Sequence, residues 1–372
     1  MIRQNFNADW TVEKGDGNSR MNSFLGNTQT KTVHLPYDAM IHEARTPDTK
    51  NGAQTGFYPG GEYIFQKHFT APQAWQGKPV SLVFEGVYQT ALVYLNGWLL
   101  TRNVNGYAEF TVEAGPYLKY GADNLLKVIA DNSLEPNSRW YTGSGIYRPV
   151  RLLVGNKVYL PQDTVRITTR EVGEGFALLD VTAQVQSAST VTERVTLQQT
   201  ICREGTAVLT DRQNLLLQPG ESRTVSFRYC VDSPALWSPE NPNLYTSTMQ
   251  VLEGEEELDR EETSFGIRTL SIDAAHGVRI NGQTVKLRGA CIHHDNGILG
   301  AATLPDAEER RIRQLKEAGF NAIRSSHHPA GRALLDACDR YGVLVMDELS
   351  DVWNVRKNPY DYALYFEQDW KP

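Results

Sequence analysis

Short runs of apolar residues separated by turn residues fill the first 160 positions of the chain. Residues 81–84 and 91–95 are two such runs, and no helical period is sustained around them. Between apolar flanks lies Asn96-Gly97, a pair well suited to a two-residue hairpin turn, because both central positions of that turn need a positive φ. Many short strands with Gly- and Tyr-rich loops are typical of an all-β architecture. Residues 1–160 are therefore predicted to form a β-sandwich of the jelly-roll kind.

A more regular alternation follows over residues 161–268. The apolar members of this pattern are Val181, Ala183, Val185, Val191, Val195, Leu197, Val225, Phe227 and Tyr229. Every second side chain of a strand points to the same face, so this period predicts strands with one buried face. Pro219-Gly220 and the proline-rich segment 238–242 are turn signals. A segment of roughly 100 residues with several such strands is typical of an immunoglobulin-like β-sandwich.

The pattern changes again after residue 268. Asn281-Gly282 predicts a hairpin, and a helix is predicted to begin at Pro305, a residue that suits the first helical turn. Gly319 and Gly342 are placed to end two successive helices in left-handed caps. Strands of almost uniformly apolar residues are predicted before, between and after these helices, at 285–289, 320–323 and 343–346.

Alternating strands and helices of this kind predict a parallel sheet that is buried on both faces. A complete (β/α)8 barrel needs about 250 residues, so residues 269–372 are enough for roughly three of its eight units. The expected fold is therefore multidomain and has three parts. These are a jelly roll at 1–160, an immunoglobulin-like sandwich at 161–268 and an incomplete (β/α)8 TIM barrel at 269–372.

Charge and cysteine content narrow the classes of partner. The 372 residues carry a formal net charge of -7 with acids and bases interspersed, so the sequence lacks the basic stripe of a nucleic-acid-binding protein. No run of about 18 apolar residues is present to span a membrane, and the first residues lack the apolar segment of a secretion signal. The four cysteines form no CxxC pair and are expected to be reduced thiols. These features indicate a cytoplasmic protein, with a trimmed secretion signal as the alternative.

Three polar clusters follow the three predicted strands of the barrel. The first is 291–295 (CIHHD), the second is 324–329 (RSSHHP), and the third is Asp347-Glu348, with Trp353 shortly after. In barrels of this class the working residues lie where strands end and loops begin, at one mouth. Clusters at three successive strand ends therefore predict an active site at that mouth.

A metal centre is one chemistry that could use these clusters. Six side chains are possible ligands: His293, His294, Asp295, His327, His328 and Glu348. Adjacent residues of an extended chain point to opposite sides, however, so each His-His pair offers about one ligand to a shared ion. No HxH or HExxH spacing is present. A metal-dependent hydrolase is therefore the weaker of two interpretations.

Sugar chemistry is the other interpretation. A sugar ring needs fixed donors and acceptors for its hydroxyls and an aromatic plate for its apolar face. The chain supplies such groups in Arg324, His327, Asp347, Glu348, Trp140 and Trp353. Asp347 and Glu348 do not form the catalytic pair. Neighbours on one strand cannot flank a glycosidic bond from opposite faces with their carboxyl groups about 5–5.5 Å apart.

The segment 321–329 (NAIRSSHHP) and its continuation to Asp347-Glu348 closely resemble the long signature of family 2 glycoside hydrolases. Further similarities to this family are found at 94–97 (YLNG), 143–150 (GSGIYRPV), 264–268 (SFGIR), 286–289 (KLRG) and 293–295 (HHD). The resemblance covers essentially the whole chain, in the family's order of sugar-binding jelly roll, immunoglobulin-like sandwich and barrel.

The resemblance implies a retaining exo-glycosidase that acts on terminal β-linked sugars of an oligosaccharide or glycoside. It implies that His327 is catalytic, as a stabiliser of the transition state. It also implies places in the sugar pocket for Arg324 and Glu348. Residue type and position at the strand ends and in the jelly roll make further substrate-contact candidates of His293, His294, Asp295, Asp347, Trp353, Arg139 and Trp140. The family's acid/base belongs to an Asn-Glu pair after strand four, and its nucleophile is a glutamate near strand seven. No Asn-Glu follows Glu348, so the chain by itself is expected to lack both and to be inactive.

Three departures from the family pattern bear on the substrate. His328 stands where the signature usually has tyrosine, and Cys291-Ile292 stands where many members have Asn-Arg. The stretch 138–141 (SRWY) carries no acid where the archetypal β-galactosidases have a pocket aspartate. Arg139 in this stretch would equally suit an anionic sugar such as a glucuronide.

Three functions stay open at this point. Hydrolysis of β-galactosides is the expected one, β-glucuronidase activity is the alternative within the family, and a carbohydrate-binding protein without catalysis is the alternative outside it. No cofactor is evident, although a divalent cation such as Mg²⁺ is left open for the complete enzyme. No nucleic acid or membrane partner is expected, and a homo-oligomer is left open.

Overall fold

Antiparallel strands at the start of the chain form two sheets that pack face to face. The computed structural model describes residues 1–15, 30–352 and 355–369. One sheet has the order β1-β10-β5-β8, and the other has the order β3-β2-β4-β9-β6-β7. The strands are β1 Ile2–Asn5, β2 Trp10–Lys14, β3 Lys31–Val33, β4 Gly61–Thr70, β5 Val80–Phe84, β6 Thr90–Leu95, β7 Trp98–Asn103, β8 Phe110–Glu113, β9 Asp123–Asn132 and β10 Val150–Val154. Trp10, Phe65 and Phe84 lie in the core between the sheets, and the predicted jelly roll is confirmed.

Turn chemistry places the β6–β7 hairpin where the sequence predicts it. Asn96 and Gly97 have φ values of 52° and 90°, and Leu95 pairs with Trp98 across the turn. The Asn96 amide donates to the Tyr117 carbonyl oxygen at 2.8 Å, which ties the turn to the loop before β9. Short 3-10 helices occupy other loops of the chain, at η1 Met40–His42, η2 Gly52–Thr55, η3 Gln73–Trp75, η4 Gly115–Tyr117, η5 Gly297–Leu299 and η6 Tyr362–Leu364.

The second unit is a sandwich of longer strands. In one sheet β13 pairs with β11, β12 and β16, and the other sheet has the order β15-β14-β17-β18. The strands are β11 Val158–Tyr159, β12 Arg166–Gly173, β13 Phe176–Ser187, β14 Glu193–Arg203, β15 Thr206–Leu217, β16 Ser222–Asp232, β17 Tyr245–Glu253 and β18 Glu256–Phe265. Every second residue of β13 from Ala177 to Val185 is buried, and the predicted immunoglobulin-like sandwich is confirmed. Val191, predicted within a strand, lies in the loop before β14 and is exposed. All four cysteines are free.

A short antiparallel hairpin leads into an α/β segment, and this segment confirms the predicted start of a TIM barrel. Its elements are β19 Leu270–Asp273, β20 Gly277–Ile280, β21 Gln283–Thr284, β22 Gly289–Ile292, α2 Pro305–Glu317, β23 Ala322–Ser325, α3 Arg332–Tyr341, β24 Leu344–Met346 and α4 Phe366–Asp369. Within the described residues, β22, β23 and β24 form a three-stranded parallel sheet. Pro305 is the first residue of α2, and Gly342, at φ 69°, caps α3 in the left-handed conformation, both as predicted.

The first barrel strand begins later than the predicted range of 285–289. Val285 still donates its N–H to the hairpin strand β20. The N–H of Arg288 then donates to the Asn321 side chain at 2.8 Å, while the Arg288 carbonyl oxygen accepts the backbone N–H of Asn321 at 3.0 Å. The ladder of β22 therefore starts only at Gly289, and Cys291, predicted to follow the strand, lies within it.

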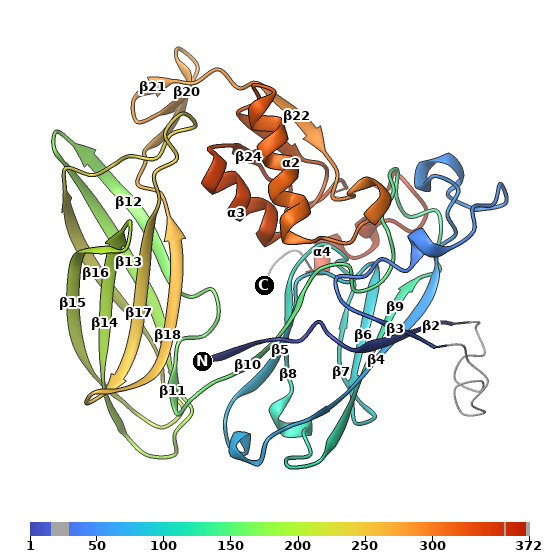
Figure 1. Cartoon of the computed structure of the whole chain (residues 1–372), viewed down its shortest axis with the longest axis horizontal. Helices are drawn as coiled ribbons and strands as arrows, with labels where there is room; N and C mark the ends of the chain where they lie inside the picture. Colours follow the sequence, from blue (N-terminus) through green and yellow to red (C-terminus); the bar gives the residue numbers. More distant parts are fainter. Residues whose placement is uncertain (16–29, 353–354, 370–372) are drawn as a thin grey trace.

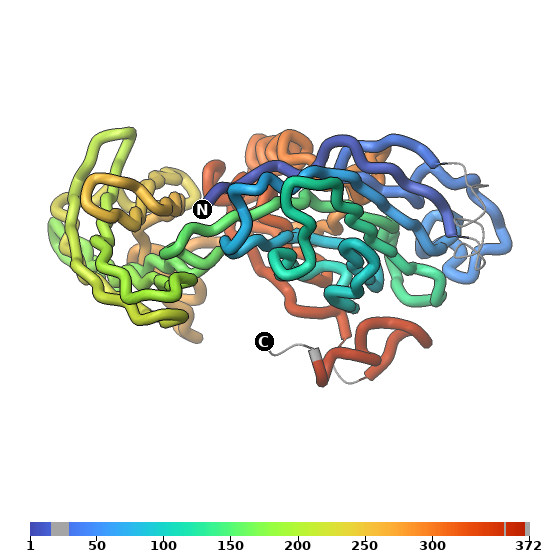
Figure 2. The backbone as a smooth tube through the Cα atoms, turned by 90° about the horizontal axis from the view of Figure 1, so that it is seen from below, coloured from blue at the N-terminus to red at the C-terminus, as the bar shows by residue number. Residues whose placement is uncertain are grey.

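The α/β segment packs on both sandwiches (Figure 1). The indole of Trp237, in the second sandwich, donates to the Asp339 carbonyl oxygen of α3 at 2.8 Å. The guanidinium of Arg332, at the start of α3, binds both carboxylate oxygens of Glu109 in the jelly roll, at 2.7 and 2.9 Å, and also binds Asp163. Figure 2 shows the second sandwich at one end of the molecule and the jelly roll towards the other end. The α/β segment is thus held by contacts to each of them.

The buried carboxylate of Asp38 also joins the jelly roll to the α/β segment. Its Oδ1 accepts the backbone N–H groups of Met40 and Ser144, at 2.9 and 3.0 Å. Its Oδ2 accepts the Tyr141 hydroxyl at 2.6 Å and the N–H of Ala301, which precedes α2, at 2.8 Å. Burial raises the pKa of Asp38, although these four hydrogen bonds act in the opposite direction. One carboxylate therefore fixes a jelly-roll loop against the barrel.

Asp38→Asn should lower the free energy of unfolding by about 1–3 kcal/mol, because the amide nitrogen would face a donor in a buried site. Denaturant unfolding followed by fluorescence measures this change. Asp232→Asn, which alters an exposed aspartate, is the matched control and should change stability by less than about 0.5 kcal/mol. Equal stability of the two variants would contradict the role assigned to Asp38.

Candidate active site

The carboxyl ends of β22, β23 and β24 lie side by side at one edge of the parallel sheet. Cys291, Arg324 and Met346 are in register across the three strands. Each strand leads into one of the polar clusters predicted from the sequence. Because parallel strands end at the same edge, the structure brings the three clusters together.

Glu348 is the acceptor that organises this edge. Its Oε2 lies 2.7 Å from Nδ1 of His327, and its Oε1 accepts a hydrogen bond from Nε of Arg324. The hydrogen bond to Glu348 raises the pKa of the Arg324 guanidinium above its ordinary value. The ends of β23 and β24 are therefore clamped together by a carboxylate that binds one side chain with each oxygen.

An open cavity of about 600 Å³ adjoins this clamp. It is lined by Arg139, Arg324, His327, Glu348, Leu349, Ser350, Asp351, Lys357 and Phe366. Arg139, from the jelly roll, donates to both carboxylate oxygens of Asp351, at 2.6 and 3.3 Å, and Lys357 donates to the same carboxylate at 2.8 Å. Burial raises the pKa of Asp351, but the hydrogen bonds from Arg139 and Lys357 outweigh burial and leave that pKa below its usual value.

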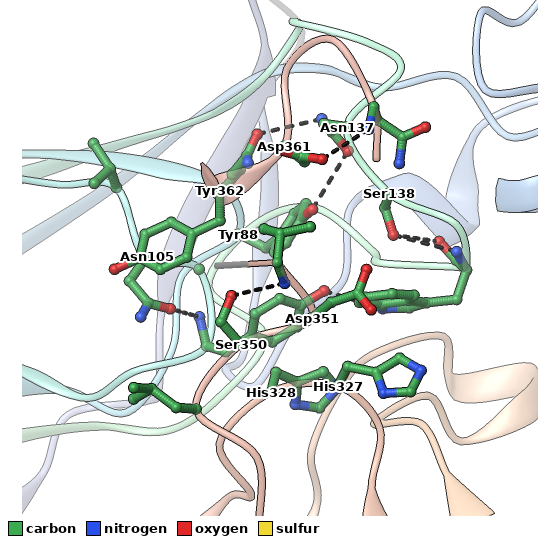
Figure 3. A pocket seen from close by; sticks show the side chains of 18 residues that line it. Tyr88, Asn105, Asn137, Ser138, His327, His328, Ser350, Asp351, Asp361 and Tyr362 are labelled. Carbon is green, nitrogen blue, oxygen red and sulfur yellow. Dashed lines mark hydrogen bonds between the residues drawn. The ribbon is translucent and has the colours of Figure 1, made fainter. Parts of the chain in front are cut away.

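A narrower crevice between the jelly roll and the barrel shares His327 and Asp351 with this cavity (Figure 3), and Trp140 lines the crevice. Its indole N–H donates to the Tyr107 hydroxyl at 3.1 Å. One ring contact is a stack on His293, with centroids 5.1 Å apart and planes 14° apart, and another is an edge contact to His327 at 5.7 Å. Figure 3 shows His327 and His328 on the barrel side of the crevice and Tyr88 and Asn137 on the other side. A jelly-roll side chain is thus part of the surroundings of His327.

The other predicted site residues that the structure describes lie outside the open cavity. His293 lies beneath Trp140, and its Nδ1 is 2.6 Å from the Ser326 carbonyl oxygen. Asp295 borders a separate surface hollow beside α2. Asp347 accepts the N–H of Ala330 at 2.9 Å and so holds the loop before α3. Trp353 lies outside the described residues.

His294 and His328 are buried between the barrel and the jelly roll, with exposed fractions of 6% and 2%. The ring of His328 stacks on Tyr107, with centroids 4.0 Å apart and planes 8° apart. Burial lowers the pKa of His294 to about 3 and holds the pKa of His328 well below its ordinary value. Burial keeps both rings neutral at neutral pH. The substrate contact predicted for His294 therefore has no support from this geometry.

The six candidate metal ligands do not converge. Among the residues that the structure describes, no group of three or more His, Cys, Asp or Glu side chains is placed to hold a metal ion. Both oxygens of Glu348 are already bound, and His294 faces away from His327. The described helices include none with the length and apolar content needed to cross a membrane.

The sequence did not single out Asp351, Lys357, Tyr107 or Phe366, although each contributes to the site. For Asp351 a sequence signal exists, because it comes three residues after Glu348 and so follows the same predicted strand. Tyr107 lies far from the barrel in sequence and has no local signal. Its place becomes evident only when the two units are packed together.

Three family profiles match the chain in succession. The glycosyl hydrolase 2 galactose-binding domain-like profile matches residues 10–165, the glycosyl hydrolases family 2 profile matches 158–268, and the glycosyl hydrolases family 2 TIM barrel profile matches 274–361. Together these profiles span nearly the whole chain in the order of the three structural units.

Individual relatives give the same picture. Beta-galactosidase BoGH2A from Bacteroides ovatus is 38% identical over 98% of this chain, which spans 43% of that protein. A putative beta-glucuronidase from Formosa agariphila is 32% identical over 99% of the chain, which spans 35% of that protein. The crystal structure of a glycosyl hydrolase family 2 member from Bacteroides cellulosilyticus aligns with a TM-score of 0.94 at 36% identity, over 100% of this chain and 48% of that one. The chain thus spans less than half the length of these relatives.

Lowering the pH should destabilise the fold through His294. An unfolded histidine takes up a proton near pH 6.5, whereas folded His294 does so near pH 3. Between these values the unfolded state binds more protons, so the free energy of unfolding falls as the pH falls. The maximal contribution is about 1.4 kcal/mol per pH unit.

Denaturant unfolding at a series of pH values from 4 to 7, on the chain and on His294→Gln, measures the contribution. All other titrating groups are present in both proteins, so the difference between the two slopes isolates His294. We expect a shallower dependence in the variant. Parallel dependences would contradict the assignment.

Proposed function

Because the chain belongs to family 2 of the glycoside hydrolases, we propose that it is part of a retaining exo-β-glycosidase that removes terminal β-galactosyl groups. The pairing of Glu348 with both Arg324 and His327, beside the open cavity, is the observation that carries this proposal. The Bacteroides ovatus relative, a beta-galactosidase, supports the choice of sugar. The two catalytic carboxylates of the family are expected outside these 372 residues, which by themselves are expected to be inactive.

We place the proposed unit boundaries at 1–160, 161–268 and 269–372. The change from the jelly-roll sheets to the second sandwich between β10 and β11 supports the first boundary approximately. The end of β18 at Phe265, before the hairpin that starts with β19, supports the second.

Glu348 sets the hydrogen-bonding state of His327 in the proposed enzyme. An ionised carboxylate only accepts hydrogen bonds, so Nδ1 of His327 carries the proton in their 2.7 Å contact. Nε2 is then left for the substrate. Hydrogen bonds to the sugar hydroxyls strengthen as the ring flattens towards the oxocarbenium ion, which lets His327 stabilise the transition state more than the bound substrate. Arg324 keeps N–H groups beyond Nε for a second sugar oxygen.

The charges around the cavity favour a neutral sugar. Arg324 is paired with Glu348, and both Arg139 and Lys357 are held by Asp351. The cavity's cations therefore already have carboxylate partners. A β-glucuronidase is the second candidate, favoured by the surplus of one cation among these five groups and by the Formosa agariphila relative. A carbohydrate-binding protein without catalysis is the third.

Hydrolysis of a panel of aryl β-glycosides, by the enzyme with a complete barrel, separates these candidates. We expect the β-galactoside to give the highest kcat/KM. A higher value for the β-glucuronide would establish the second candidate. Binding of sugars without hydrolysis of any panel member would leave only the third.

His327→Ala in the active enzyme should lower kcat and kcat/KM together by roughly 100-fold or more, with little change in KM. The contact that it removes is stronger in the transition state than in the ground state. Steady-state kinetics on the aryl β-galactoside measures both constants. His276→Ala, which removes an exposed histidine from the β19–β20 hairpin, is the control and should leave both unchanged. An effect of His327→Ala confined to KM or to the melting temperature would indicate a residue that only fills the mouth of the barrel.

Asp351→Asn should shift the enzyme's preference towards anionic sugars. Loss of the carboxylate frees Arg139 and Lys357, which can then bind a uronate. The ratio of kcat/KM for the aryl β-glucuronide to that for the aryl β-galactoside should rise by roughly tenfold, the equivalent of one charge-assisted hydrogen bond. Adding Arg139→Gln should remove most of the gain. An unchanged ratio in Asp351→Asn would show that the pairing does not control specificity.

A further inference from the structure

A second, small cavity lies between α2, the strand ends and the jelly roll. Its walls include Arg148, Ile292, His294, Glu308, Ser325 and His328. Its volume of about 10 Å³ is at the lower limit of the space that a single water molecule needs. The cavity is separate from the open cavity that Arg324 and Glu348 line.

Buried polar atoms without a hydrogen-bond partner are found in four of the side chains that line this cavity. They are Nε of Arg148, Nδ1 of His294, Oε2 of Glu308 and Nε2 of His328, and the statement holds for the part of the chain that the structure describes. Each of the four residues is at most 6% exposed. An unpaired buried polar group costs about 1–3 kcal/mol, so several of them around one cavity indicate a partner that more than one of them shares.

The contacts of the two imidazoles define which of their nitrogens can accept. Nε2 of His294 lies 2.8 Å from the Thr142 carbonyl oxygen and must carry the proton, because a carbonyl only accepts. Nδ1 of His328 lies 3.2 Å from the Pro329 carbonyl oxygen and carries the proton for the same reason. The other nitrogen of each neutral ring therefore carries no proton and offers a lone pair that can accept a hydrogen bond.

The other two side chains supply one acceptor and one donor. Oε1 of Glu308 accepts from the Asn296 amide at 2.8 Å, and Oε2 lies 3.6 Å from the Arg311 guanidinium without a hydrogen bond. The terminal nitrogens of Arg148 donate to the carbonyl oxygens of Tyr107 and Pro329, at 2.6 and 3.0 Å, so its Nε–H is the donor that is left. The cavity thus offers three acceptors and one donor.

This set of groups selects the occupant. Imidazole and carboxylate are types of metal ligand, but no three such groups among the described residues are placed to hold a metal ion, and the Arg148 guanidinium in the same cavity repels a cation. An anion would have no hydrogen atom to give to the three acceptors. A water molecule has two hydrogen atoms to donate and can accept from a third group, and the cavity is of its size.

We propose that one water molecule is bound in this cavity, donating to Nδ1 of His294 and to Nε2 of His328 and accepting from Nε of Arg148. The centroids of the two imidazole rings lie 4.9 Å apart with their planes at 87°, so the two rings that line the cavity are direct neighbours.

The bound water positions the residues of the open site through their neighbours in the chain. His293 precedes His294, and His327 precedes His328. Adjacent residues of an extended chain point to opposite sides. Both His327 and His328 line the crevice, but of the two only His327 lines the open cavity and only His328 lines the small one. A water that links His294 to His328 therefore fixes both histidine pairs against the jelly-roll residue Arg148.

A crystal structure of the 372-residue chain at high resolution tests the proposal directly. We expect electron density for one water within hydrogen-bond distance of His294 Nδ1, His328 Nε2 and Arg148 Nε. Anomalous scattering from a metal ion at this place would overturn the proposal. Direct hydrogen bonds among the four groups, with no room for water, would overturn it too.

Water relaxation dispersion gives a second measurement in solution, because it counts buried waters with long residence times. His328→Phe keeps a planar ring against Tyr107 but removes the nitrogen acceptor, and it should lower the count by one. His276→Phe, at an exposed histidine, is the matched control and should leave the count unchanged. An unchanged count in folded His328→Phe would contradict the proposal. If that variant does not fold, the crystal structure of the unsubstituted chain still decides it.

Discussion

A carboxylate removed from water needs donors around it, and Asp38 finds them in two different units of the chain. Two glycines next to the Asp38 carboxylate leave room for it because they have no Cβ atom. A Cβ at Gly143 would lie 2.8 Å from Oδ2 of Asp38, and one at Gly300 would lie closer still. The loop that Asp38 holds carries Arg139 and Trp140 to the barrel mouth. The position of the jelly-roll side of the site therefore depends on this one buried group.

From that loop the contacts continue into the barrel through stacked rings. Trp140 is fixed by the Tyr107 hydroxyl and by its stack on His293, and it presents an edge to His327. Tyr107 stacks on His328, makes an edge contact with His294 and also contacts Tyr88 of the jelly roll. Aromatic contacts of this kind add to area burial and restrict ring orientation. The orientation of His327 is thus determined by the jelly roll from one side and by Glu348 from the other.

Turns and helix ends that are set by neighbouring residues could be predicted from the sequence. Contacts between the jelly roll and the barrel could not. The Asn96-Gly97 turn needs positive φ and Gly342 ends α3, so both follow from the chain near them. The pairing of Arg139 with Asp351 joins residues 212 positions apart and has no local signal. His294 was expected at the substrate because its sequence neighbours are polar and lie at a strand end. Because side chains alternate along the strand end, His294 points instead into the interface between the barrel and the jelly roll, where burial lowers the pKa of its imidazole.

The α/β segment raises the question of what stabilises it, since its buried cluster is small. Its members are Ile312, Ile323, Leu334, Ala337, Cys338 and Val343. Within the described residues β24 pairs only with β23, and Met346 on it is 59% exposed. Such an edge is suited to a further strand, in keeping with relatives more than twice as long. The contacts of Trp237 and Arg332 with the two sandwiches supply stabilisation that the small core lacks. Because Arg324 and Glu348 lie at the ends of the same strands, these interunit contacts also preserve the geometry of the candidate site.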